Sequence, residues 1–173
     1  MAVYRELLAL TRAAVQGAGV PTTVWLADEE TGEAGAGEWA GFARERQAAG
    51  DLGQRMRAAF AAAFAAGAGR VAIIGTDCPG LRPAHLTRAV ALLLDHDVVL
   101  GPATDGGYYL LGLRVLRPEL FAHKNWSTAT VLAETLADFR RLGLRVALLP
   151  ELRDVDTAAD LAAWRAESGA DTG

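Results

Sequence analysis

Short apolar runs alternate with segments of helical periodicity, and this alternation constrains the fold of the chain more than any other feature. The runs that predict strands are residues 22–27, 70–75, 97–103, 106–114 and 144–150. The segments that predict helices are residues 4–17, 52–64, 82–96, 128–142 and 156–164. Alternation of this kind is typical of an α/β layered domain with a mostly parallel sheet.

Two of these runs refine the expected sheet. Residues 70–75, "RVAIIG", are continuously apolar, which predicts a strand covered on both faces. The link between residues 97–103 and 106–114 is too short for a helical crossover. These two strands are therefore expected to be joined by an antiparallel turn, which makes the sheet mixed.

Composition limits the classes of function. The 173 residues fit a single domain, residues 1–173, and carry a net charge of −4. No basic run is longer than Arg140-Arg141, so a nucleic-acid partner is not expected. No apolar segment reaches the length of a membrane span, so no membrane partner is expected either. The one cysteine, Cys78, cannot form an internal disulfide, which suits the cytoplasm; a neutral thiol is favoured over a nucleophile.

Acidic side chains follow three of the predicted strands. Asp77 follows "VAIIGT", Asp105 follows "VVLGPAT", and both Asp154 and Asp156 follow "VALLPELR". In open α/β sheets the ligand crevice lies beyond the carboxyl ends of the parallel strands. Hard divalent cations bind carboxylate and phosphate oxygens, so this edge of the sheet is a candidate site for a metal and a diphosphate.

Each of these features also has a purely structural interpretation. Asp77 can cap a turn, and Gly106 and Gly107 can form a tight turn instead of admitting a ligand to the backbone. In "NWSTATV", Ser127 or Thr128 can cap a helix, or the helix N-terminus can receive a phosphate or a sugar hydroxyl. The residues alone leave these alternatives open.

Five blocks, in this order, carry a resemblance to a known family: "GDLGQRM", "VAIIGTDCPGL", "GPATDGGYYLLGL", "NWST" and "DVDTAADL". From about residue 50 to 165 the chain resembles the GT-A-like glycosyltransferases of the arsenosugar-biosynthesis, or radical-SAM-associated, type. These belong to the nucleotide-diphospho-sugar transferase superfamily. The resemblance implies an α/β, Rossmann-like three-layer GT-A fold with a mostly parallel mixed sheet.

The resemblance also implies roles for individual residues. Asp77 and Asp156 match the superfamily's metal-binding aspartates, which hold Mg²⁺ or Mn²⁺, and Asp105 matches a catalytic position on the acceptor side. The residues implied to bind substrate are Gln47, Gly53, Thr76, Gly106, Gly107, Trp126 and Ser127.

The implied function is that of a metal-dependent glycosyltransferase with a nucleotide-sugar donor and a small-molecule acceptor. A nucleotidyltransferase of the guanylyl or cytidylyl type and a non-catalytic remnant are the alternatives. Relatives begin with a buried strand and a phosphate-binding loop, whereas this chain starts at the helix that normally follows them. The resemblance places the missing strand near the middle of the sheet and leaves three alternatives: homodimerisation, a gapped sheet or inactivity.

Overall fold

The structure, a computed structural model, describes residues 2–27 and 37–170. The acidic, glycine-rich sequence at residues 28–41 predicts a loop, and most of it lies outside the described residues. The helices are α1 (Ala2–Ala18), α3 (Leu52–Ala65), α4 (Pro83–Leu92), α5 (Val131–Arg141), α6 (Ala158–Ala170) and the short 3-10 helix η2 (Pro118–Phe121). The strands are β1 (Thr23–Leu26), β2 (Ala43–Arg46), β3 (Val71–Ile74), β4 (Val98–Pro102), β5 (Tyr108–Leu113) and β6 (Val146–Leu148).

Four strands form the main sheet, in the order β3-β5-β4-β6. Strand β5 is antiparallel to both of its neighbours, whereas β4 and β6 are parallel. Strands β3, β4 and β6 therefore run in one direction, and β5 runs against them. The antiparallel turn expected after residue 103 is confirmed, and so is the mixed sheet.

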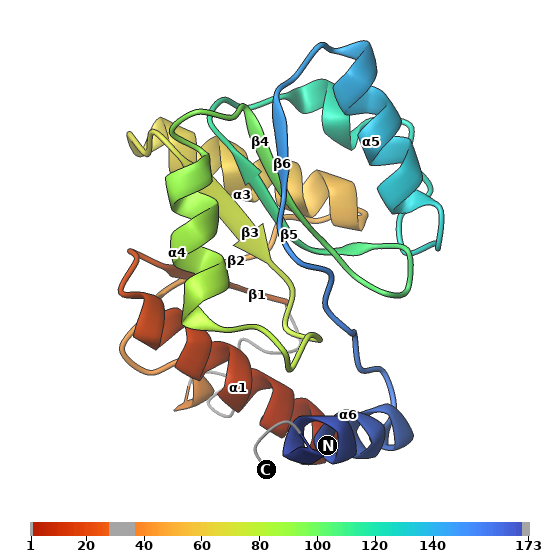
Figure 1. The fold of residues 1–173 in the computed structure, drawn as a ribbon. Coiled ribbons are helices and arrows are strands. Elements are labelled where there is room, and N and C mark those ends of the chain that lie inside the picture. The colour runs from red at the N-terminus through yellow and green to blue at the C-terminus, as the bar shows by residue number, and fades with distance from the viewer. Residues whose placement is uncertain (1, 28–36, 171–173) are drawn as a thin grey trace.

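Helices cover both faces of this sheet and give three layers (Figure 1). In β4, Val99 faces the layer of α1 and α4, while Val98 and Leu100 face the layer of α3 and α5. This alternation follows from the pleat of a strand, in which successive side chains point to opposite faces. Because both faces are buried, β4 and β5 read in the sequence as continuous apolar runs.

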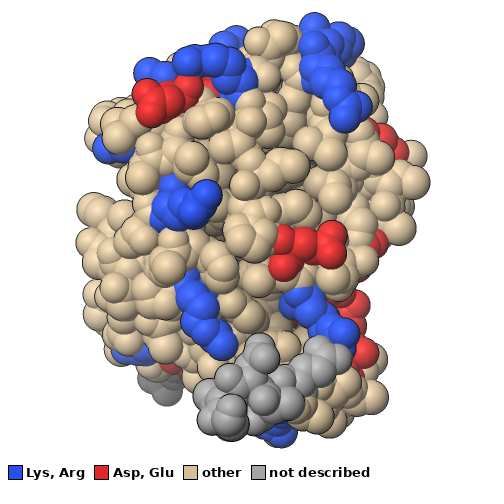
Figure 2. Space-filling model, viewed as in Figure 1, with Lys and Arg blue, Asp and Glu red and all other residues tan. Residues whose placement is uncertain are grey.

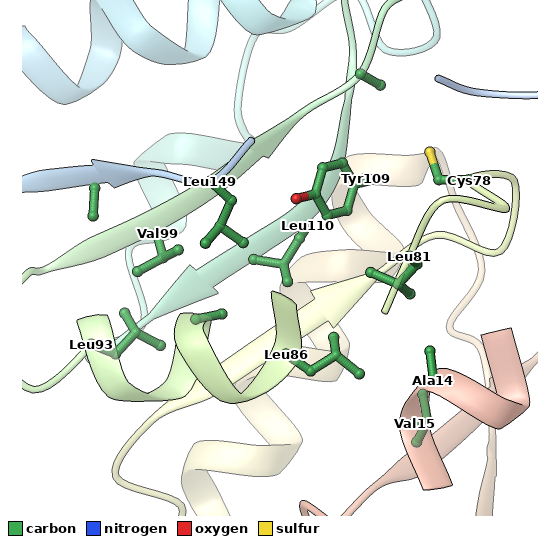
Figure 3. Packing of buried hydrophobic residues seen from close by; sticks show 13 residues of the cluster. Ala14, Val15, Cys78, Leu81, Leu86, Leu93, Val99, Tyr109, Leu110 and Leu149 are labelled. Carbon is green, nitrogen blue, oxygen red and sulfur yellow. The ribbon is translucent and has the colours of Figure 1, made fainter. Parts of the chain in front are cut away.

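Figure 3 shows how the first of these faces is filled. Tyr109 and Leu110 of β5 lie beside Leu149, which follows β6, and Leu86 of α4 packs below them. All four side chains are buried. The phenol of Tyr109 donates a hydrogen bond of 3.0 Å to the carbonyl of Pro150, so its one polar atom is satisfied at the rim of the core.

A second, two-stranded sheet contains β1 and β2, which are parallel and pair from Thr23–Ala43 to Leu26–Arg46. Within the described residues no ladder joins it to the main sheet, so the two sheets are separate, as in the gapped arrangement that was one of the alternatives. Strand β3 is consequently an edge strand with half-buried side chains. Both faces of β3 nevertheless pack on the core, with Val71 and Ile73 against one cluster and Ala72 and Ile74 against the other, so the expected coverage of both faces is confirmed.

Local sequence signals match the helix termini of the structure in some places and not in others. Asp51 caps α3 in a reciprocal capping box, accepting from the Gln54 amide at 2.8 Å. At the start of α6 the hydroxyl of Thr157 accepts a hydrogen bond from the Asp160 amide. Helix α5 begins at Val131, and its cap position is Thr130, so the expected caps Ser127 and Thr128 were wrong.

The surface carries no long basic band on the face drawn in Figure 2, where separate basic side chains border an acidic patch. In the part of the chain that the structure describes, no helix is both long and apolar enough to cross a membrane.

Candidate active site

Three loops meet beyond the carboxyl ends of the three strands that share a direction. The first loop follows β3 and carries Asp77, the second is the turn at residues 104–107 between β4 and β5, and the third is residues 152–156 after β6. The edge at which these loops gather is the one where open α/β sheets bind ligands. The sequence-based expectation that separate strands bring acidic residues to one rim is borne out by the electrostatic contacts described below.

The turn between β4 and β5 is tight. The Gly106 amide donates to the carbonyl of Ala103, and the Ala103 amide donates to the carbonyl of Gly107. Gly106 has φ +86°, a region that favours glycine, so this residue lets the chain reverse direction. The carboxylate of Asp105 accepts from the Gly107 amide at 2.7 Å, which orients an otherwise exposed side chain.

The pKa of Asp77 is raised by its surroundings. The surrounding protein partly desolvates the Asp77 carboxylate and so raises its pKa, although the residue as a whole is exposed, and the charges of Asp105 and Asp154 raise the pKa further. The adjacent thiol of Cys78 is buried, and burial together with the charge of Asp77 raises the pKa of Cys78 far above its ordinary value. The interpretation of Cys78 as a neutral, non-nucleophilic thiol agrees with this environment.

The third loop brings Asp154 to the group. One oxygen of its carboxylate accepts hydrogen bonds from the hydroxyl of Thr104 at 2.9 Å and from the amide of Asp105 at 3.0 Å. Asp156, which the resemblance selected as the partner of Asp77, has an exposed side chain, and its backbone lies against the carboxylate of Asp160. The residue that the sequence reasoning missed is Thr104, whose only signal was its place beside Asp105.

A metal ion would find oxygen ligands here. Among residues 2–27 and 37–170, no group of three or more His, Cys, Asp or Glu side chains is arranged to hold a metal by itself. Carboxylates gathered in this way are nevertheless suited to a hard cation, which commonly takes one or two of them and completes its shell with phosphate oxygens and water. The donor chemistry therefore fits Mg²⁺ or Mn²⁺ bound together with a diphosphate.

Residues 125–130 lie against the turn of the site. The Leu132 amide donates to the carbonyl of Gly106 at 3.0 Å, and a Cβ on Gly106 would lie 2.2 Å from the backbone oxygen of Ala129. Ser127 has φ +60°, which is uncommon for a residue other than glycine. The structure thus places Gly106 against Ala129 and Leu132, and the substrate-binding roles of Ser127, Gly106 and Gly107 stay predictions.

The remaining predicted residues have structural contacts of their own. Trp126 packs on Gly53 of α3, where a Cβ would lie 2.3 Å from the indole Nε1, so glycine is required for this contact. The side-chain amide of Gln47 donates to the carbonyl of Trp25 at 3.0 Å and so ties the end of β2 to β1. Thr76 lies half-buried in the bend between β3 and Asp77.

Removing the charge of Asp77 is expected to stabilise the metal-free protein. The raised pKa means that the folded state holds the Asp77 proton more tightly than the unfolded chain, so the charged form costs stability above that pKa. Asp77→Asn should raise the melting temperature at pH 7, by roughly 2–4 °C for each 1 kcal/mol relieved in a chain of this length. The gain should shrink as the pH falls through the raised pKa of Asp77 and should vanish below the ordinary value of 3.8, where both the folded and unfolded states are protonated. Thermal melts in a chelator from pH 3.5 to 8 would test this, and a gain independent of pH would contradict it.

The fold and the site define a class of protein. A structure similar to this one is that of a protein from Desulfovibrio desulfuricans G20 described as a putative nucleotide-diphospho-sugar transferase, with a TM-score of 0.79, 33% identity, and coverage of 90% of this chain and 71% of that one. Rv0371c from Mycobacterium tuberculosis H37Rv shares the fold, with a TM-score of 0.60, 17% identity, and coverage of 91% and 81%. The chain has the fold of a nucleotide-diphospho-sugar transferase, which confirms the predicted fold class.

A family model identifies the family to which this chain belongs. The chain belongs to the family described as "Uncharacterized protein conserved in bacteria (DUF2064)", whose model matches residues 10–128. That range includes Asp77, Asp105 and the turn at 104–107, and it ends before Asp154. A search of curated proteins found no match.

Proposed function

We propose that this protein is a metal-dependent glycosyltransferase that uses a nucleotide-diphospho-sugar donor, of the arsenosugar-biosynthesis or radical-SAM-associated type, acting in the cytoplasm. The observation that carries the proposal is the convergence of carboxylates from three loops at the ligand-binding edge of this fold. The similarity to a protein described as a putative nucleotide-diphospho-sugar transferase supports the donor class.

In this proposal Asp77 and Asp156 hold Mg²⁺ or Mn²⁺, which would neutralise the diphosphate as it leaves. Asp105 orients the acceptor hydroxyl and accepts its proton, and general-base help of this kind is typically worth about 10²- to 10⁴-fold in rate. The hydrogen bond from the Gly107 amide holds one oxygen of Asp105, so its other oxygen is the one that would face the acceptor. Ser127 and Trp126, which precede the residue that contacts Gly106, would form the acceptor wall.

The proposal is tested by nucleotide binding. A thermal-shift screen of UDP, GDP, CDP and ADP with Mn²⁺ would select the nucleoside diphosphate, because a ligand of the native state raises the melting temperature. Calorimetry on Asp77→Asn should then show metal-dependent affinity reduced by at least about tenfold, since even residues that only support a metal ligand are worth about 10- to 100-fold.

The matched control is Asp95→Asn, which removes an exposed carboxylate before β4, at the opposite edge of the sheet. It should bind like the wild type. Unchanged affinity of Asp77→Asn with and without Mn²⁺ would defeat the assignment. Release of pyrophosphate from a nucleoside triphosphate, in the presence of an acceptor, would favour a nucleotidyltransferase instead.

A further inference from the structure

The segment at residues 152–155 continues the sheet beyond β6. The Leu152 amide donates to the carbonyl of Pro102 at 3.0 Å, and the Thr104 amide donates to the carbonyl of Leu152 at 3.1 Å. Leu152 also forms a parallel bridge with Ala103. This pairing places Asp154 beside the turn that carries Asp105.

The side chain of Asp154 adds a second attachment to the same turn. The same carboxylate oxygen, Oδ1, accepts hydrogen bonds from both the Thr104 hydroxyl and the Asp105 amide. The carboxylate of Asp105 is in turn held by the Gly107 amide. Asp154 therefore fixes the backbone from which the Asp105 side chain projects, and the turn fixes the side chain itself.

The next residue attaches the same segment to the loop after β3. The Val155 amide donates to the carbonyl of Asp77 at 2.9 Å. The Val155 side chain is buried with Leu7 of α1 and Leu161 of α6, so this point is anchored in the packing of two helices. Asp154 and Val155 thus connect the turn at residues 104–107 and the loop after β3 to the same segment, residues 152–155.

We propose that Asp154 is a positioning residue, which holds Asp105 at a fixed place relative to Asp77 through the acceptor oxygen that Thr104 and Asp105 share. Its significance for catalysis rests on the proposed function, whereas its effect on the turn does not. The role requires an acceptor atom at this place and does not require a negative charge. Asparagine presents the same acceptor oxygen without the charge. Asp154→Asn should therefore preserve the two hydrogen bonds that Asp154→Ala removes.

Amide hydrogen exchange, followed by NMR on the full chain, tests the positioning directly. Asp154→Ala should speed exchange of the Asp105 amide by about 5- to 10-fold, the loss expected for one hydrogen bond. Asp154→Asn should leave it close to the wild-type rate. Thr104→Val, which removes only the hydroxyl donor, should give a smaller change, and Thr104→Ser should restore the wild-type rate. The Val155 amide should be unaffected by either Thr104 variant.

Unchanged exchange of the Asp105 amide in Asp154→Ala would overturn the proposal, and so would equal acceleration in Asp154→Asn and Asp154→Ala. If Asp154→Ala did not fold, the exchange rates of the Asp105 amide in Thr104→Val and Thr104→Ser would be compared instead. Equal rates in those two variants would count against the proposal.

Binding of the selected nucleoside diphosphate with Mn²⁺ then tests the link to function. Asp154→Asn should retain affinity, Asp154→Ala should lose it, and Asp156→Asn should lose it for the separate reason that it removes a proposed metal ligand. If the wild type binds none of the four nucleotides, the proposed function fails while the exchange result still stands. If the wild type binds and Asp154→Ala binds equally well, the positioning role in the reaction is overturned.

Discussion

Replacing Asp138 by alanine is expected to lower the free energy of unfolding by about 3–5 kcal/mol, the cost typical of leaving a buried charge without its partner. The side chain of Lys124 is only 2% exposed and forms an ion pair with Asp138 on α5. Without that carboxylate, the ammonium group would remain buried and uncompensated. Urea unfolding followed by circular dichroism would measure the loss.

The control is Arg141→Ala, because Arg141 is the second partner of Asp138, at 2.9 Å, and its side chain is 60% exposed. Exposed ion pairs contribute about 0–1 kcal/mol, so this variant should be nearly neutral. Equal losses in the two variants would contradict the explanation based on burial.

The contribution of this pair has a definite pH dependence. Burial tends to raise the pKa of Asp138, but hydrogen bonds from Lys124 and Arg141 outweigh it and leave the pKa below its ordinary value of 3.8. The stabilisation is therefore complete above that ordinary value and is lost as the pH falls through the lowered one. The difference between the wild type and Asp138→Ala should accordingly shrink in acid.

Replacing Gly106 by alanine is expected to cost about 2–5 kcal/mol. A left-handed residue with a Cβ costs about 1–2 kcal/mol, and overpacking typically adds about 1–3 kcal/mol. The clash is with the backbone oxygen of Ala129, which cannot rotate away as a flexible side chain could. The same urea experiment measures the loss, and nucleotide binding should weaken as residues 125–130 move off the turn.

Gly143→Ala separates the two contributions. Gly143 has φ +63°, but a Cβ there would meet nothing within 4 Å. This variant should therefore show the cost of the left-handed conformation alone, about 1–2 kcal/mol. A loss in Gly106→Ala no larger than in Gly143→Ala would show that the contact with Ala129 is not tight.

The sequence predicted the main sheet well because its strands are buried, and buried strands are apolar. It did not predict β2, residues 43–46, because all four residues are exposed and carry no apolar alternation. It also placed the start of α5 at residue 128, since hydroxyl side chains resemble helix caps; in the structure the hydroxyl of Thr128 instead donates to the carbonyl of Asn125. Local patterns cannot reveal which partner a polar group finds.

The candidate site was predicted in outline for a similar reason. Strand direction brings the acidic loops to one edge, and the sequence shows which residues follow each strand. The hydrogen bond between Asp154 and Thr104 could not be predicted, because it depends on where the segment after β6 runs, and that is set by long-range pairing. The contact of Trp126 with Gly53, more than 70 positions apart, depends on packing in the same way.

The burial of Lys124 has a practical consequence, because it is the only lysine in the chain. Reagents that acylate side-chain amines find no accessible target in the folded molecule, and they gain one only when the contact between residue 124 and α5 opens. Acylation at this one position, read by mass spectrometry, would therefore report how often that part of the molecule opens while the rest stays folded.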